Sequence, residues 1–96
     1  MEIHSFVRFH AAAGKENEVQ EALRAVLAAS REEADCLNIH AFRGTRDARI
    51  FYIHSRWRSE QAFDAHAALP HTVRFLQQMD QLTDQPRDVT RTQLLD

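Results

Sequence analysis

The order of hydrophobic and polar positions divides the chain into seven segments of two kinds. Residues 2–10, 36–43, 49–58 and 89–95 are rich in β-branched and aromatic side chains with partial alternation, which predicts strands. Residues 15–31 repeat apolar positions at the spacing of a one-sided helix, formed by Val19, Ala22, Leu23, Val26 and Leu27. Two more helices are predicted at 59–68 and 70–82, with Ser59 as N-cap and Pro70 in a first turn.

This order predicts an α+β fold with a ferredoxin-like split βαβ arrangement and an antiparallel sheet. Residues 44–48 supply Gly and Asp between two strands, so the segments on either side form a hairpin. No repeat, low-complexity tract or linker interrupts the 96 residues, and we expect one domain over residues 1–96.

Alternation sorts the strand residues into two faces. The more apolar face, which we expect the helices to cover, comprises Ile3, Ser5, Val7, Phe9, Leu37, Ile39, Ala41, Phe51, Ile53, Ser55 and Trp57. The other face would leave four large apolar side chains in water: Phe6, Phe42, Ile50 and Tyr52. A homodimer that packs sheet against sheet would bury them; the alternative is a partly exposed face with scattered aromatics.

Three small residues, Ser5, Ala41 and Ser55, fall on the face assigned to the core. Beside Trp57 and Phe51 they would leave a cavity between sheet and helices. Close approach of the helices to the sheet explains them equally well.

Composition narrows the function classes. The formal charge of −2 is spread along the chain, which argues against nucleic acid as a partner. The single Cys36 excludes an internal disulfide, and no apolar run approaches the ~20 residues needed to cross a bilayer. The start of the chain has no apolar signal region, so we expect a soluble, cytoplasmic protein without a membrane partner.

A set of motifs spread over nearly the whole chain carries a family resemblance. They are Gly14-Lys15 after the first strand, Ser30-Arg31-Glu32-Glu33 and Cys36, then Trp57-x-Ser59 followed by His66-x-x-x-Pro70-His71. With them the chain resembles the antibiotic biosynthesis monooxygenase domain, including its quinol monooxygenases. The resemblance implies a dimeric α/β barrel with a substrate pocket in each protomer between sheet and helices. Ser55 is a departure, because family members often have Glu at that place.

The resemblance implies a monooxygenase that uses molecular oxygen without metal or flavin on a small quinol-like or polyketide-like aromatic substrate. Such an enzyme must stabilise a deprotonated substrate, and an imidazole with a pKa near ~6.5 suits that task. His66 is the first candidate for the base, and His71 would orient the substrate or stabilise its oxyanion. The candidate substrate-binding residues are Trp57, Phe63, Phe75, Ser5 and Ser55.

Structural roles for the same residues stay open. The alternative for Trp57 is packing in the core, and the alternative for the two histidines is to cap or bridge helix ends. We expect no metal, because His66 and His71 are five residues apart across a proline without an evident third ligand. We expect no cofactor either, since the last helix has Phe75, Leu76 or Gln77 where haem-degrading relatives carry a histidine.

Two other functions remain at this stage. One is a noncatalytic dimeric barrel that binds a small molecule. The other is an isomerase or lyase that uses the same histidines for proton transfer.

Overall fold

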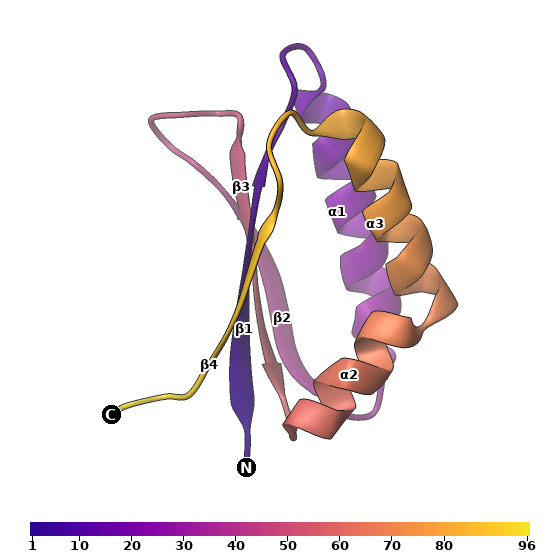
Figure 1. Cartoon of the computed structure of the whole chain (residues 1–96), viewed down its shortest axis with the longest axis vertical. Coiled ribbons are helices and arrows are strands. Elements are labelled where there is room, and N and C mark those ends of the chain that lie inside the picture. Colours follow the sequence, from indigo (N-terminus) through magenta and orange to yellow (C-terminus); the bar gives the residue numbers. More distant parts are fainter.

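A computed structural model describes all residues 1–96 as one sheet with three helices on one side of it (Figure 1). The elements are β1 (Ile3–His10), α1 (Glu16–Ser30), β2 (Cys36–Arg43), β3 (Ile50–Trp57), α2 (Glu60–Ala68), α3 (Pro70–Leu82) and β4 (Asp88–Thr92). The strands lie in the order β2-β3-β1-β4, and every neighbouring pair is antiparallel. This confirms the ferredoxin-like α+β prediction.

α1 begins where the chain turns sharply away from the sheet. Gly14 has φ +81, a backbone conformation that glycine adopts without steric cost. Glu16 and Glu18 then lie in the first turn, where carboxylates interact favourably with the free N–H groups of the helix. The apolar spacing works as predicted, since Val19, Ala22, Leu23, Val26 and Leu27 are all buried.

The hairpin between β2 and β3 depends on Gly44. A Cβ at this position would collide with the carbonyl oxygen of Asp47, so any other residue would push the turn open. The turn is closed by the Gly44 amide, which donates to the Ile50 carbonyl at 2.8 Å.

The break between α2 and α3 follows the predicted signals. The Ser59 hydroxyl accepts a hydrogen bond from the Ala62 amide at 3.1 Å and so caps α2. Leu69 is extended, and Pro70 occupies the first turn of α3, where its missing N–H costs no helical bond. The two helices therefore change direction beside the end of β3.

The face assignment is confirmed for most positions. Every residue assigned to the helix-covered face is buried or half-buried. On the open face Phe6, Phe42 and Tyr52 are 43%, 56% and 40% exposed, whereas Ile50 is half-buried at the strand end.

β4 ends at Thr92, which pairs with His4, because β1 itself begins at Ile3 and offers little edge beyond it. The predicted extension to residue 95 is thus wrong.

The core consists of two clusters of buried side chains. The larger joins 13 residues of α1, α3 and the sheet, including Phe9, Val19, Phe51, Phe75 and Met79. The smaller comprises Ile3, Trp57 and Phe63 and lies at the end of the sheet that α2 covers. No helix is long and apolar enough to cross a membrane.

Candidate functional site

Trp57 closes β3 and is the centre of the smaller cluster. Its side chain is fully buried, and its indole Nε1 donates to the Ser55 hydroxyl at 2.8 Å. The two residues are neighbours on one face of the strand, so the backbone itself brings them together. Ser55 thus satisfies a donor that would otherwise be buried without a partner.

His66 packs its imidazole onto this tryptophan from α2. The two ring centroids lie 4.3 Å apart with an interplanar angle of 35°, and the Phe63 ring lies 5.7 Å from the imidazole. Phe63 and His66 are three residues apart, which places both on the same face of α2 as expected. The imidazole therefore has aromatic groups on its inner side.

Glu33 joins the two histidines. Its carboxylate oxygen Oε2 lies 2.8 Å from His66 Nδ1 and 2.8 Å from His71 Nε2. Each neutral ring would donate its N–H to this oxygen, since an ionised carboxylate only accepts. Thr72 Oγ1 lies 3.4 Å from the same His66 nitrogen. The cluster of Glu33, His66 and His71 is called the His–Glu–His cluster below.

Burial lowers the pKa of His66 below its ordinary value, against the opposing effect of the nearby Glu33 carboxylate. The ring is therefore neutral at neutral pH. With Nδ1–H directed to Glu33, the free lone pair is on Nε2, which makes no hydrogen bond in the structure. This is the arrangement of an oriented general base.

The other predicted site residues do not share one open cavity. Trp57, Ser5 and Ser55 line none of the three surface pockets, and the Ser5 hydroxyl is buried without a hydrogen-bond partner. Phe75 packs edge-on against Phe9 in the larger cluster, and with His71 it lines a separate pocket of about 200 Å³ between α1 and α3. The Trp57 indole occupies the space beside Ser55, whereas Ala41 and Phe51 line an open groove between α1 and β2.

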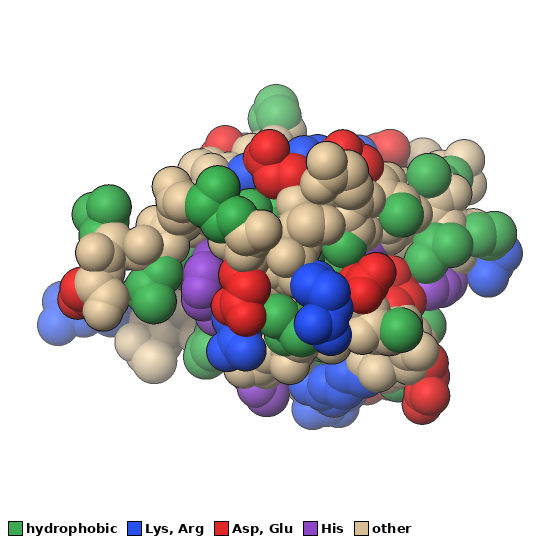
Figure 2. Space-filling view, turned by 90° about the horizontal axis from the view of Figure 1, so that it is seen from below, with side chains coloured by type: hydrophobic (Ala, Val, Ile, Leu, Met, Phe, Trp, Pro, Cys, Tyr) green, Lys and Arg blue, Asp and Glu red, His purple; other side chains and the backbone are tan.

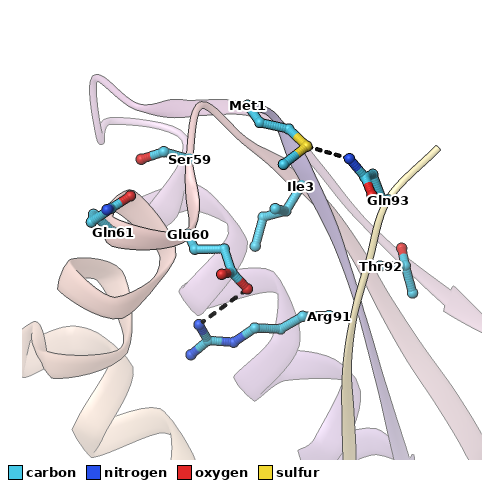
Figure 3. A pocket seen from close by; sticks show the side chains of 8 residues that line it. All are labelled: Met1, Ile3, Ser59, Glu60, Gln61, Arg91, Thr92 and Gln93. Carbon is cyan, nitrogen blue, oxygen red and sulfur yellow. Dashed lines mark hydrogen bonds and ion pairs between the residues drawn. The ribbon is translucent and has the colours of Figure 1, made fainter.

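An open cleft does lie next to the smaller cluster (Figure 3). Its volume is about 390 Å³, and it is lined by Met1, Ile3, Ser59, Glu60, Gln61, Arg91, Thr92 and Gln93. Ile3 separates this cleft from Trp57 and Phe63, against which it packs. Arg91 lies over the Phe63 ring and pairs with Glu60 and with Asp64, the latter at 2.7 Å.

This end of the molecule has acidic and basic side chains side by side, interspersed with apolar groups (Figure 2). No single charge dominates the surface around the cleft. Among the side chains that line the cleft, Glu60 is acidic and Arg91 is basic.

Three side chains present donors that could hold a metal ion. The ligand atoms of Glu33, His66 and His71 all lie within 4.8 Å of one another. The 2.8 Å separations within the cluster are hydrogen-bond distances, whereas donors around one tetrahedral ion with ~2.0 Å bonds lie about 3.3 Å apart. The groups as arranged fit a shared proton better than an ion.

Sequence reasoning missed Glu33 as a partner of the histidines and therefore found no third ligand. The residue follows α1 and is 33 positions from His66, so no local spacing reveals the contact. Its only signal was its place in the Ser30-Arg31-Glu32-Glu33 motif. Arg91 was missed because its neighbours on β1 and α2 are distant in sequence.

Comparison with known proteins places the chain in a family. Residues 3–78 match the sequence profile described as antibiotic biosynthesis monooxygenase. No curated protein matches the chain. Proteins of this family typically dimerise.

Solved structures with the same fold cover nearly the whole chain. PA3566 from Pseudomonas aeruginosa is 27% identical, with TM-score 0.91 over 99% of this chain and 95% of its own. Rv0793 from Mycobacterium tuberculosis is 23% identical, with TM-score 0.94 over 100% and 97%. A structure described as an antibiotic biosynthesis monooxygenase is 19% identical, with TM-score 0.92 over 98% and 99%. With the profile match over residues 3–78, the chain belongs to the antibiotic biosynthesis monooxygenase family.

Proposed function

We propose that the protein is a cofactor-independent monooxygenase that oxidises a small quinol-like or polyketide-like aromatic substrate with molecular oxygen. The observation that carries the proposal is the neutral, buried His66, fixed by Glu33 at 2.8 Å and backed by Trp57 and Phe63. A base in such a position removes a phenolic or enolic proton.

His66 would take this proton on Nε2. The resulting imidazolium is stabilised by the Glu33 carboxylate, which already accepts from Nδ1. His71, bound to the same oxygen, orients the carboxylate or stabilises the substrate oxyanion. The deprotonated substrate then gives electrons directly to oxygen.

The reaction balances without an external reductant for an anthrone-type substrate. The conversion R₂CH₂ + O₂ → R₂C=O + H₂O takes both electron pairs from the substrate C–H bonds. One oxygen atom enters the product and the other leaves as water.

We place substrate entry at the cleft beside Ile3, because Ile3 lines this cleft and packs in one cluster with Trp57 and Phe63. Binding requires Phe63 to turn aside so that a planar substrate reaches Trp57 and the base. Ser55 and Ser5 then provide small polar contacts at the inner end.

The protein acts, in this proposal, as a homodimer whose open sheet faces pack together. The open face exposes Phe6, Phe42 and Tyr52, and it also holds the His4–His54 pair, with Nδ1 and Nε2 2.8 Å apart. Phe6 stacks on His54 at 4.8 Å, so apolar and polar groups are interleaved as in a partly polar interface.

The test is oxygen uptake with a panel of hydroquinones and anthrones. The wild-type chain should consume oxygen, while His66→Ala and Glu33→Gln should lower kcat by roughly 100-fold or more, as expected for loss of a general base. Dialysis against a chelator should leave the rate unchanged.

A matched control is His10→Gln. His10 also contacts a carboxylate, Asp84 at 2.5 Å, but it lies away from the tryptophan. The His10→Gln variant should consume oxygen at the wild-type rate. Equal rates in His66→Ala and wild type would refute the proposal, as would a rate lost on chelation.

One observation favours a second candidate, an isomerase or lyase. His66 and His71 contact one carboxylate oxygen, so a proton accepted by one ring can be returned by the other. Turnover of a substrate under strictly anaerobic conditions would select this function over the first.

A further inference from the structure

A second pocket lies between α1 and the edge strand β2. Its volume is about 460 Å³, within the ~300–1,000 Å³ of small-molecule sites. It is lined by Gln20, Leu23, Arg24, Leu27, Arg31, His40, Ala41, Phe42, Arg43 and Phe51, and is called the arginine groove below. It shares no residue with the His–Glu–His cluster or with the cleft beside Ile3, while Phe42 at its border is also on the open sheet face proposed to pack in the dimer.

The groove combines an apolar floor with a cationic rim. Leu23, Leu27 and Phe51 of the floor belong to the buried core, so their surfaces are fixed. The rim carries the guanidinium groups of Arg24, Arg31 and Arg43, and no Asp or Glu lines the groove. A chain of net charge −2 thus concentrates three positive groups around one hollow.

Arg31 and Arg43 have no carboxylate within 4 Å, as is also true of Arg8, Arg46 and Arg74, whereas Arg24 on the rim pairs with Glu21 at 3.4 Å. Arg31 donates to the Ile39 carbonyl at 2.9 Å. Arg43 donates to the Ala48 carbonyl at 2.8 Å and to the Gln20 side chain at 3.3 Å. By contrast, a carboxylate oxygen lies within 4 Å of five arginines elsewhere: Arg49, Arg56, Arg58, Arg87 and Arg91.

These contacts also hold the guanidinium groups in place. Neutral partners fix each group without cancelling its charge, so little side-chain entropy remains to be lost on binding an anion. Arg43 lies over the Phe51 ring at 5.2 Å, which leaves the other face of its planar group for a second ring.

We infer that the arginine groove binds a small aromatic carboxylate. The ring lies on the apolar floor beside Arg43, and the carboxylate accepts hydrogen bonds from the guanidinium rim. A small inorganic anion would leave the floor unused, and a neutral aromatic would leave the rim unpaired. The inference does not depend on the function proposed for His66.

The test is a titration of the 96-residue chain with 2-naphthoate, monitored by amide chemical shifts and by calorimetry. The shifts should be largest at Leu27, Ala41 and Phe51, with little change at Glu33 or Ser55. The neutral 2-naphthamide should bind roughly tenfold more weakly, since the charge-assisted bonds are lost. Higher salt should weaken the binding of 2-naphthoate and leave the binding of 2-naphthamide unchanged.

Substitutions separate the rim from the floor. Arg43→Gln should weaken 2-naphthoate binding roughly tenfold, while Arg46→Gln, which removes an arginine outside the groove, should change it less than about twofold. Ala41→Leu keeps all charges and fills the hollow, so it should also weaken binding and keeps the test valid if Arg43→Gln unfolds.

His66→Ala should bind 2-naphthoate like the wild type, whatever its effect on oxygen uptake. Equal affinity for the carboxylate and the amide would overturn the inference. So would equal losses in Arg43→Gln and Arg46→Gln, or shifts that map to the cleft beside Ile3.

Discussion

Replacement of Glu33 by glutamine tests the His–Glu–His cluster without any substrate. Glu33→Gln keeps the size of the side chain and removes its charge. Two bonds, each 2.8 Å long, change from charge-assisted to neutral. Bonds to charged groups contribute about 1.5–3 kcal/mol and neutral ones about 0.5–1.5 kcal/mol, so each bond loses about 1 kcal/mol or more.

The net loss is smaller than this sum, because the neutral amide costs less to bury than the carboxylate, whose side chain is only 15% exposed. We expect the free energy of unfolding to fall by about 1–2 kcal/mol. For a domain of this size that corresponds to a Tm lower by about 5–15 °C.

The assay is urea unfolding followed by circular dichroism at fixed protein concentration, because a dimer makes the midpoint concentration-dependent. Glu32→Gln is the matched control, since Glu32 is exposed and its side chain forms no hydrogen bond or ion pair. It should shift stability by no more than about 0.5 kcal/mol. If Glu33→Gln is as stable as Glu32→Gln, the cluster does not stabilise the fold as argued.

Three further predictions concern the same fold. Ser55→Ala leaves the Trp57 N–H buried without its acceptor and should lower the free energy of unfolding by about 1–3 kcal/mol in urea melts, whereas an unchanged midpoint would show that the indole finds another partner. Because burial holds the folded pKa of His66 below its unfolded value of 6.5, the unfolded chain takes up this proton first as the pH falls, so stability should decrease as the pH falls through 6.5 toward the lower folded pKa, and less so in His66→Asn. Equal pH dependence in the two would contradict this. Phe42→Asp, on the open sheet face, should shift the mass measured by light scattering from that of a dimer to that of a monomer. Val73→Asp, on the exposed side of α3, is the control and should leave the mass unchanged. If the Phe42→Asp variant is still a dimer, the interface lies elsewhere.

Most of the fold could be predicted from the sequence, because the patterns that indicate its helices and strands involve residues close together in the chain. The repeat of Val19, Leu23 and Val26 predicts a helix face, and Ser59 and Pro70 mark helix starts by backbone hydrogen-bonding rules. The end of β4 was overestimated, because a strand's length depends on the partner edge and not on its own residues.

The site was only partly predictable. His66, Phe63 and Trp57 were expected to meet, since one helical face and one strand end carry them. Glu33 reaches the histidines through a tertiary contact that no periodicity encodes. Whether Ser55 borders a cavity depends on where the Trp57 indole lies, and the indole packs against Ser55. The sequence does not encode this orientation of the side chain.

The contact between Trp57 and His66 gives the protein a built-in optical signal. Trp57 is the only tryptophan, is fully buried, and has an imidazole 4.3 Å from its ring. A protonated imidazole quenches indole emission by electron transfer, whereas the neutral ring does so weakly. The fluorescence of the native protein therefore reports the charge of His66 directly, and a substrate that separates the two rings will change the emission before any chemistry occurs.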